Sequence, residues 1–349
     1  MSLDKITLEI ITNPIDWNGV LQEIGDFDFY HTFEYHLIEV IEDQVPTLIV
    51  CKNDNNIIAL PLLVRKIYNT NYYDATSVYG YAGPISKGIT SEFNNKLFIE
   101  KVMSFFQENK IISVFSRLNP YINYQQDILK NFGSIVNQGK VVNIDLTLDT
   151  TIQRQNYQSR LKTQINKSRR HCIIKKADTP KDLRDFIDIY YENMNRVQAE
   201  DHYYFNQEYF DKILTSKNFK AELLLALDKD SGVTIGGSLF VTTKNIVQYH
   251  LGATKNEFLD VMPAKLLLDE MRIIATKRGR QFFNLGGGLG GVHNDSLFNF
   301  KSSFSKYFKD FELWKLIINQ KVYDELVESR KTTSTSFFPK YRFLDKTQL

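Results

Sequence analysis

Residues 281–304 decide the fold, and they read QFFNLGGGLGGVHNDSLFNFKSSF. Gln281–Leu285 is a mostly apolar run, which predicts a buried strand. Five glycines follow it within residues 286–291. Beyond them, Leu297, Phe300 and Phe304 recur every three or four residues, which predicts a short helix with one apolar face. The stretch therefore predicts a strand, a glycine-rich turn and a helix.

The glycines match G-x-G-x-x-G at Gly286, Gly288 and Gly291, the pattern of dinucleotide-binding turns. That reading requires a helix directly after the turn and a complete strand–helix–strand unit. Only 58 residues follow Gly291, and residues 292–295 resemble a turn. No Gly-Lys-Ser/Thr follows, so a nucleotide P-loop is excluded too. Two interpretations stay open: a turn that needs positive φ, or a loop whose backbone lies close to a substrate.

Working outward from this stretch, the same order of elements occurs twice. It is strand, helix, hairpin, strand or turn, helix and strand. In the second half these are 172–176, 181–196, 223–227 with 235–241, 247–251, 263–277 and 281–285. In the first half they are 6–11, 17–24, 47–50 with 57–64, the turn 79–84, 91–109 capped by Ser91, and 111–115. The sequence predicts a duplicated α/β unit that divides near residue 149, followed by a helix and tail over 320–349.

The net charge of +2 conceals an uneven distribution. Residues 1–149 sum to −7 and the remainder to +9. Within residues 154–176 there are eight Lys or Arg residues and no carboxylate. A solvated helix face is one interpretation, although such faces usually mix signs. The other is contact with phosphate or RNA, for which the candidates are Arg160, Lys162, Lys167, Arg169 and Arg170.

Several classes of protein and site are excluded by the pattern. Cys51 and Cys172 stand alone, so a disulfide framework or Cys-ligated metal site is not expected. The six histidines form no metal-binding motif, and no G-x-S-x-G elbow occurs. No apolar run reaches the length of a membrane span, and no secretion signal is visible. We expect no metal, no tightly bound cofactor and a cytoplasmic location.

The duplicated unit, the basic opening of its second copy and the Leu-x-x-Phe-Lys-x-x-Phe segment together resemble the Fem-type (FemABX-like) acyltransferases. These are tandem GNAT-fold proteins that form peptidoglycan cross-bridges with aminoacyl-tRNA as donor. The resemblance covers essentially the whole chain. It implies two GNAT-like domains, over residues 1–149 and 150–319, each a mixed sheet flanked by helices. It also implies that the tail 320–349 packs on the first domain.

The resemblance carries roles to individual residues. Phe300 and Lys301 match the family's Phe-Lys pair at the acyl-transfer site, where the lysine is thought to stabilise the oxyanion. A fixed cation suits that task, since negative charge develops on the carbonyl oxygen during acyl transfer. Tyr35 resembles the family's first-domain helix near the acceptor cleft. On the second-domain helix, Tyr204 matches an aromatic position, whereas Arg196 is a cation displaced from the family's position.

Strand ends in the second half supply further candidates for substrate contact, namely Tyr249, His250, Asn284, Gly286 and Gly287. Glu200 and Asp201 are candidates to take the proton of the attacking amine. Residues 254–263 occupy the place where single-domain GNAT enzymes cradle a pyrophosphate, yet they hold two carboxylates and no glycine. This composition disfavours an acyl-CoA donor and favours a charged tRNA.

We therefore expect an acyltransferase that moves an aminoacyl or acyl group onto an amine of a cell-wall or surface-glycan precursor. The donor is aminoacyl-tRNA or acyl-CoA, and the acceptor is a small molecule or glycan precursor. Two alternatives remain. One is an acyl-CoA-dependent N-acyltransferase of a nucleotide-linked sugar. The other is a non-catalytic protein that binds RNA or an anionic glycan on a degenerate acyltransferase scaffold.

Overall fold

The computed structural model describes residues 6–41, 43–288 and 295–343, and it divides the chain into two compact units. Unit 1 comprises residues 1–138 and 311–349, and unit 2 comprises residues 139–310. These divisions fall inside β7 (Ser134–Asp145) and β13 (Tyr307–Ile317), so each strand has residues in both units. The sequence placed the divisions at 149/150 and 319/320, where turn residues follow the strands. A continuous strand carries no local signal of such a division.

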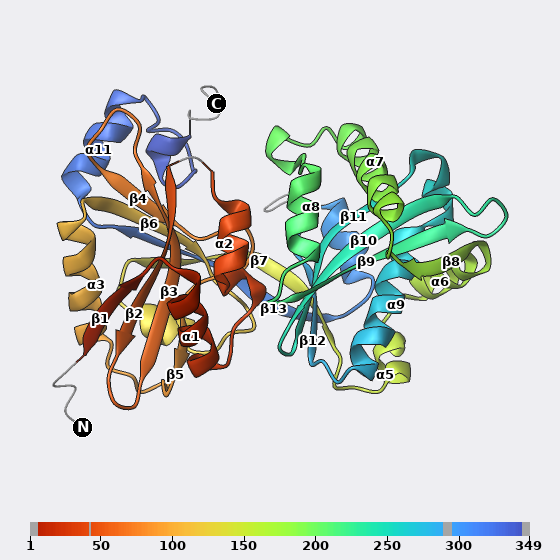
Figure 1. The fold of residues 1–349 in the computed structure, drawn as a ribbon, viewed down its shortest axis with the longest axis horizontal. Helices are drawn as coiled ribbons and strands as arrows, with labels where there is room; N and C mark the ends of the chain where they lie inside the picture. The colour runs from red at the N-terminus through yellow and green to blue at the C-terminus, as the bar shows by residue number, and fades with distance from the viewer. Residues whose placement is uncertain (1–5, 42, 289–294, 344–349) are drawn as a thin grey trace. The chain divides into compact units, whose positions relative to one another are not determined.

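Unit 1 is a mixed sheet flanked by helices (Figure 1). Its strand order is β1-β2-β3-β4-β6-β13, with β5 beside β3, and only the β4–β6 pair is parallel. Its remaining elements are β1 (Thr7–Ile11), α1 (Pro14–Ile24), η1 (Phe29–His31), α2 (Phe33–Glu39), β2 (Gln44–Lys52), β3 (Ile57–Lys66), β4 (Tyr73–Thr76), β5 (Ile85–Lys87), α3 (Lys96–Glu108), β6 (Ile111–Arg117), α4 (Gln125–Leu129), α11 (Gln320–Ser329) and η4 (Lys340–Arg342).

Unit 2 repeats this plan. Its strand order is β7-β12-β11-β10-β9-β8, and only the β11–β12 pair is parallel. The elements are α5 (Thr150–Gln155), α6 (Ser159–His171), β8 (Cys172–Lys176), α7 (Pro180–Arg196), η2 (Asp201–Tyr203), α8 (Gln207–Leu214), β9 (Lys220–Asp228), β10 (Thr234–Thr243), β11 (Ile246–Thr254), η3 (Asn256–Val261), α9 (Pro263–Lys277), β12 (Phe282–Gly286) and α10 (Ser296–Ser302). The predicted fold class, a duplicated mixed α/β unit, is confirmed.

Helices cover both faces of the unit 2 sheet, as two adjacent glycines of β10 show. A Cβ at Gly236 would meet Pro263 of α9, and a Cβ at Gly237 would lie 2.4 Å from the Phe186 ring of α7. Successive residues of a strand face opposite sides of its sheet. Helix α9 therefore packs on one face and α7 on the other. The α9 face holds an apolar core to which α6 and residues 298–304 also contribute.

The predicted elements of unit 1 are present, with one error in a helix start. Ser91 does not cap α3, which begins at Lys96. The side chain of Asn95 donates to the carbonyls of Ile128 and Lys130, which holds this segment against the loop after α4. Long-range contacts of this kind leave no trace in local composition. No helix among the described residues is long and apolar enough to cross a membrane.

Candidate active site

The candidate site begins where two parallel strands of unit 2 separate. Strands β11 and β12 pair only through residues 246–248 and 282–284. Beyond that point β11 continues to Thr254 and β12 ends at Gly286. The register of β11 against β10 also shifts between Leu239 and Phe240, which is a bulge at the same level. Such irregularities redirect side chains and are common beside functional sites.

Lys301 lies at the glycine end of β12. It belongs to α10, and its Nζ donates to the carbonyl of Gly287 at 2.7 Å. The same Nζ lies 6.0 Å from the ring centroid of Tyr249 on β11. Burial lowers the pKa of Lys301 to about 8, although the nearby Asp295 carboxylate acts in the opposite direction. The amine is thus held in place and partly withdrawn from water.

Phe300, the other member of the Phe-Lys pair, packs against the apolar core of unit 2. Its ring packs edge-on against Phe304, at 5.9 Å between centroids, and lies against the apolar core. Phe304 is fully buried. Consecutive residues on a helix point in different directions, so Phe300 fixes the short helix while Lys301 reaches the turn after β12. The role that the family resemblance gives to the pair stays a prediction.

The glycines after β12 have separate local explanations. Gly286 has φ of +79°, a conformation that favours glycine. A Cβ at Gly288 would lie 1.7 Å from a carboxylate oxygen of Asp295. That carboxylate caps α10 by accepting from the backbone N–H groups of Leu297 and Phe298. Gly288 therefore makes room for the helix cap. Gly290 and Gly291 lie outside the described residues.

Three of the predicted contact residues lie where β11 and β12 diverge. Tyr249 lies over Gly252, where an added Cβ would come within 2.1 Å of the phenol oxygen, and burial raises the pKa of Tyr249 to about 12. His250 Nε2 lies 2.6 Å from the Tyr209 hydroxyl, and burial lowers the pKa of His250 to about 4. The buried amide of Asn284 accepts from the N–H of Gly286.

Arg196 and Tyr204 lie near the end of α7 and bond to nearby protein groups. Arg196 donates to Asn256 Oδ1 at 2.6 Å and also contacts Asn193 and the carbonyl of Thr254. Tyr204 donates to Asn195 at 2.8 Å. The candidate bases Glu200 and Asp201 lie in the loop that follows, where Glu200 and the His202 ring are 3.4 Å apart.

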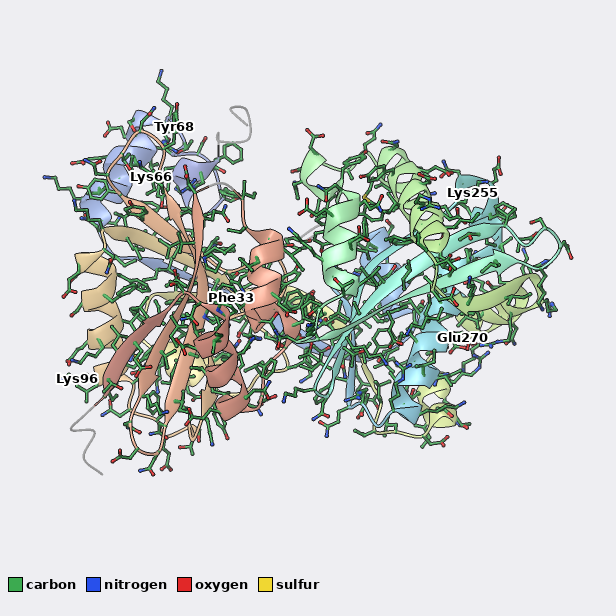
Figure 2. All side chains as sticks on the ribbon, viewed as in Figure 1. Phe33, Lys66, Tyr68, Lys96, Lys255 and Glu270 are labelled. Atoms are coloured by element: carbon green, nitrogen blue, oxygen red, sulfur yellow. The ribbon has the colours of Figure 1, made fainter. Side chains whose placement is uncertain are left out.

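The five predicted phosphate-binding cations all belong to α6, but they differ in environment. Arg169 is paired internally, since it contacts Asp269 at 2.9 Å and also Glu270, which Figure 2 labels on α9. Within the described part of the chain, Lys162 and Lys167 donate to backbone carbonyls, those of Gln155 and Asp260. Arg160 and Arg170 are exposed. The cations that remain available to an external anion are therefore Arg160, Lys162, Lys167 and Arg170.

Tyr35 lies in unit 1, on α2. It is buried, its ring packs against Phe29 and Tyr30, and its hydroxyl donates to the carbonyl of Tyr79 at 3.3 Å. Sequence reasoning missed its neighbour Glu39, one helical turn further along α2. Burial raises the pKa of Glu39 to about 7, against the opposing effects of Tyr35 and Arg117. No local sequence signal indicates this burial.

Comparisons with known proteins found a matching family model and similar solved structures. A model of the FemAB family matches residues 225–312, the segment from β9 into β13 that contains Lys301. The chain is also similar to the crystal structure of FemX, with a TM-score of 0.71 and 14% identity over 91% of this chain and 99% of that chain. The chain has a Fem-type tandem GNAT-like fold. The similarity extends over both units.

Two further solved structures share this fold. One is the C-terminal domain of a putative lysylphosphatidylglycerol synthetase from Agrobacterium fabrum, with a TM-score of 0.57 and 12% identity over 90% of this chain and 97% of that chain. The other is a tandem GNAT protein from the clavulanic acid biosynthesis pathway, with a TM-score of 0.50 and 9% identity over 90% and 99%. No functionally curated protein matched at the sequence level. Similar folds thus occur in proteins with different names.

Proposed function

We propose that this Fem-type chain is an acyltransferase that moves an aminoacyl group from tRNA onto an amine of a cell-wall or surface-glycan precursor. The observation that carries the proposal is the placement of Lys301. Its amine lies against Gly287 at the end of β12, within the segment that the FemAB family model matches. The similarity to FemX supports the same assignment at the level of fold.

In the proposed reaction, the acceptor amine attacks the carbonyl carbon of the aminoacyl ester. A C–N bond forms and the carbonyl oxygen becomes an oxyanion, which the Lys301 ammonium stabilises. Collapse of this intermediate breaks the C–O bond to the tRNA ribose. The ribose oxygen takes up a proton, and the nitrogen loses one to water or to a carboxylate. Glu200 and Asp201 remain the candidates for that carboxylate.

The environment of Lys301 suits this role. With a pKa of about 8, most molecules carry the ammonium at neutral pH. A cation held by neighbouring groups and partly shielded from water interacts more strongly with a developing negative charge than a solvated one does. Removing one such stabilising group typically slows acyl transfer by about 10²–10³-fold.

Two features support tRNA as the donor. Helix α6 presents Arg160, Lys162, Lys167 and Arg170 without a carboxylate on the same helix, which suits a phosphate backbone. On the η3 loop, where a GNAT enzyme would cradle pyrophosphate with backbone N–H groups, the N–H of Asn256 already donates to the Glu192 carboxylate at 2.6 Å. A carboxylate at this position disfavours a second anion.

The test offers the protein a radiolabelled aminoacyl-tRNA or radiolabelled acetyl-CoA, each with a pool of nucleotide-linked cell-wall precursors. We expect label from the tRNA to enter a precursor through an amide bond, and no transfer from acetyl-CoA. Transfer from acetyl-CoA alone would contradict the proposed donor. Absence of transfer from either donor, with steeply salt-dependent RNA binding, would replace the enzyme proposal by the binding alternative.

A further inference from the structure

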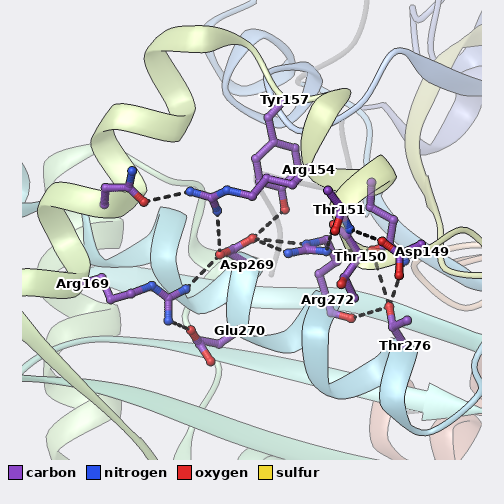
Figure 3. Close-up of polar contacts among 12 residues, drawn as sticks. Asp149, Thr150, Thr151, Arg154, Tyr157, Arg169, Asp269, Glu270, Arg272 and Thr276 are labelled. Atoms are coloured by element: carbon purple, nitrogen blue, oxygen red, sulfur yellow. Dashed lines mark hydrogen bonds and ion pairs between the residues drawn. The ribbon is translucent and has the colours of Figure 1, made fainter.

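A buried carboxylate organises the helices beside the candidate active site. Asp269 of α9 is fully buried, and Figure 3 shows the side chains that surround it. Its Oδ1 accepts from the Tyr157 hydroxyl and from Arg272, each at 2.9 Å. Its Oδ2 accepts from Arg169 at 2.9 Å and from Arg154 at 3.3 Å. One carboxylate therefore joins α9 to α5, to α6 and to the linker between them.

Such a network is costly if its only purpose is stability. Withdrawing charged groups from water carries a penalty that their attraction often fails to recover, and an apolar replacement is frequently as stable. What a buried polar network does provide is a defined geometry for the groups it holds. The network is therefore better explained if Asp269 holds one of these groups in place for another purpose. The neutral member, Tyr157, is the one that extends toward the candidate site.

Tyr157 is connected to α10, the helix of Lys301, through a contact with Phe304. Its buried ring packs edge-on against Phe304, with centroids 5.3 Å apart. Phe304 in turn packs against Phe300, at 5.9 Å. A backbone hydrogen bond links the same two segments, because the N–H of Gln158, the next residue, donates to the carbonyl of Ser303 at 2.9 Å. The end of α10 is therefore fixed to the linker between α5 and α6.

Helix α10 depends on such external supports. It has seven residues, and none of them is fully buried. Isolated helices of this length are unstable in water. The Asp295 cap holds its first turn. At its other end, the described residues show the aromatic contacts of Phe304 and the bond from Gln158. Small displacements matter at such a site, since an error of about 1 Å in a catalytic group can cost about 100-fold in rate.

We propose that Tyr157, oriented by Asp269, is a positioning residue that fixes the end of α10 and thereby holds Lys301 against Gly287. This inference rests on the proposed function, because it assigns Tyr157 to the same acyl-transfer step. It also accounts for two cations of the basic stretch. Arg154 and Arg169 both donate to Asp269, so they belong to the support around this carboxylate.

The test measures Lys301 directly, without substrate. The full-length protein is treated with an amine-acylating reagent at a series of pH values, and mass spectrometry follows labelling of the peptide that contains Lys301. Tyr157→Phe keeps the ring and removes only the hydroxyl that Asp269 holds. Phe304→Leu keeps an apolar side chain and removes the aromatic contact. Loosening α10 lets water reach the amine, so both variants should raise the labelling midpoint from about 8 toward the ordinary lysine value.

A matched control separates positioning from general loosening. Tyr190 is equally buried in unit 2, and its hydroxyl donates to the Tyr203 carbonyl at 2.7 Å. Tyr190→Phe therefore removes a comparable bond and should leave the Lys301 midpoint unchanged. We expect a rise of about half a pH unit or more for the two test variants, which is roughly a threefold loss of neutral amine at fixed pH. In transfer assays, kcat should fall in both while KM stays constant.

The proposal is overturned if Tyr157→Phe and Phe304→Leu both keep the wild-type midpoint, or if Tyr190→Phe shifts it equally. The labelling result is independent of transfer. A shifted midpoint in a protein whose transfer does not depend on Lys301 would leave the positioning geometry intact and refute the proposed function. An unshifted midpoint in a protein that requires Lys301 would do the reverse.

Discussion

Among single residues of the candidate site, Lys301 has an environment that disfavours its charged form. Lys301 is a cation placed among apolar side chains, next to Phe300 and the Tyr249 ring. Burial disfavours the ammonium, which is why its pKa falls to about 8. A lysine with this pKa changes charge within the pH range of an ordinary assay. Its protonation state is therefore a measurable handle on the proposed mechanism.

The first prediction concerns the alkaline side of the pH profile. Transfer by the wild-type protein should decline as pH rises through about 8, because Lys301 loses the proton that stabilises the oxyanion. Lys301→Arg keeps a cation at every assay pH, so its residual activity should show no such decline. Single-turnover rates between pH 6.5 and 9.5, about the range over which the lysine titrates, would measure this. Identical profiles for the two proteins would refute the assigned ionisation.

A second residue-scale prediction concerns acid stability. His31 and His36 are fully buried in unit 1, and burial lowers their pKa values to about 4 and about 3. Unfolding restores the ordinary value of about 6.5, so the unfolded chain binds more protons than the folded one between these limits. Stability should therefore fall as pH drops below about 6.5, by about 1–2 kcal/mol for each histidine at pH 5.

Urea unfolding at pH 7 and pH 5 would measure that loss, with His36→Gln as the test variant. This variant should be less stable at pH 7 but lose less stability on acidification, because one titrating group is gone. His202→Gln is the control, since His202 is exposed. Equal losses of stability in His36→Gln and the wild type between the two pH values would show that burial does not lower the pKa of His36.

At the scale of elements, local patterns predicted most helices and strands well. The ranges of α9 (Pro263–Lys277) and β8 (Cys172–Lys176) agree with the predicted ones. Pro61, which is unusual inside a strand, is accommodated in β3 for a simple reason. It lies between residues 57–59, which pair with β5, and residues 63–66, which pair with β4. Its missing N–H therefore removes no bond on that side of the strand.

The candidate site was less predictable, because its partners are distant in sequence. The cations of residues 154–176 are visible as a run, but Asp269 lies about a hundred residues away and takes two of them. No local pattern distinguishes Arg169 from Arg170. Glu39 was missed for a similar reason, since its raised pKa depends on burial that only the fold creates. Motif resemblance makes Lys301 a candidate, whereas the local pattern alone is typical of a lysine at the edge of a packed helix face.

A third prediction concerns the N-terminal cap of α10. Asp295→Ala removes the acceptor for two backbone N–H groups and should destabilise the helix by about 1 kcal/mol, with a drop in transfer rate. Asp295→Asn keeps a good cap and should preserve stability. It also removes a negative charge near Lys301, so the alkaline decline in rate should move below pH 8. Thermal melting and pH–rate profiles check both effects; equal stability of the two variants would contradict the cap.

In the molecule as a whole, two units share one arrangement of strands and helices, and the two halves of the sequence differ in net charge. Both units contain an antiparallel set of strands followed by one parallel pair, β4–β6 in unit 1 and β11–β12 in unit 2. The positive excess belongs to the second copy, which also contains Lys301. A net charge of +2 therefore describes neither half of the sequence.

A fourth prediction follows from this asymmetry. Replacing Arg160, Lys162, Lys167 and Arg170 together with glutamine should weaken tRNA binding and flatten its dependence on salt, because fewer counterions are released. The control replaces four exposed lysines of unit 1, namely Lys87, Lys96, Lys101 and Lys110. Binding titrations at several salt concentrations measure both. Equal loss of affinity in the two variants would show that α6 is not the RNA-binding surface.

The proposed mechanism depends most directly on Lys301 as the group that stabilises the oxyanion of acyl transfer. The decisive measurement is the single-turnover rate of transfer from labelled aminoacyl-tRNA to the precursor pool, compared between wild type and Lys301→Ala, with folding checked by circular dichroism. We expect a fall of about 10²–10³-fold in rate with tRNA affinity unchanged. Transfer by Lys301→Ala at the wild-type rate would contradict it.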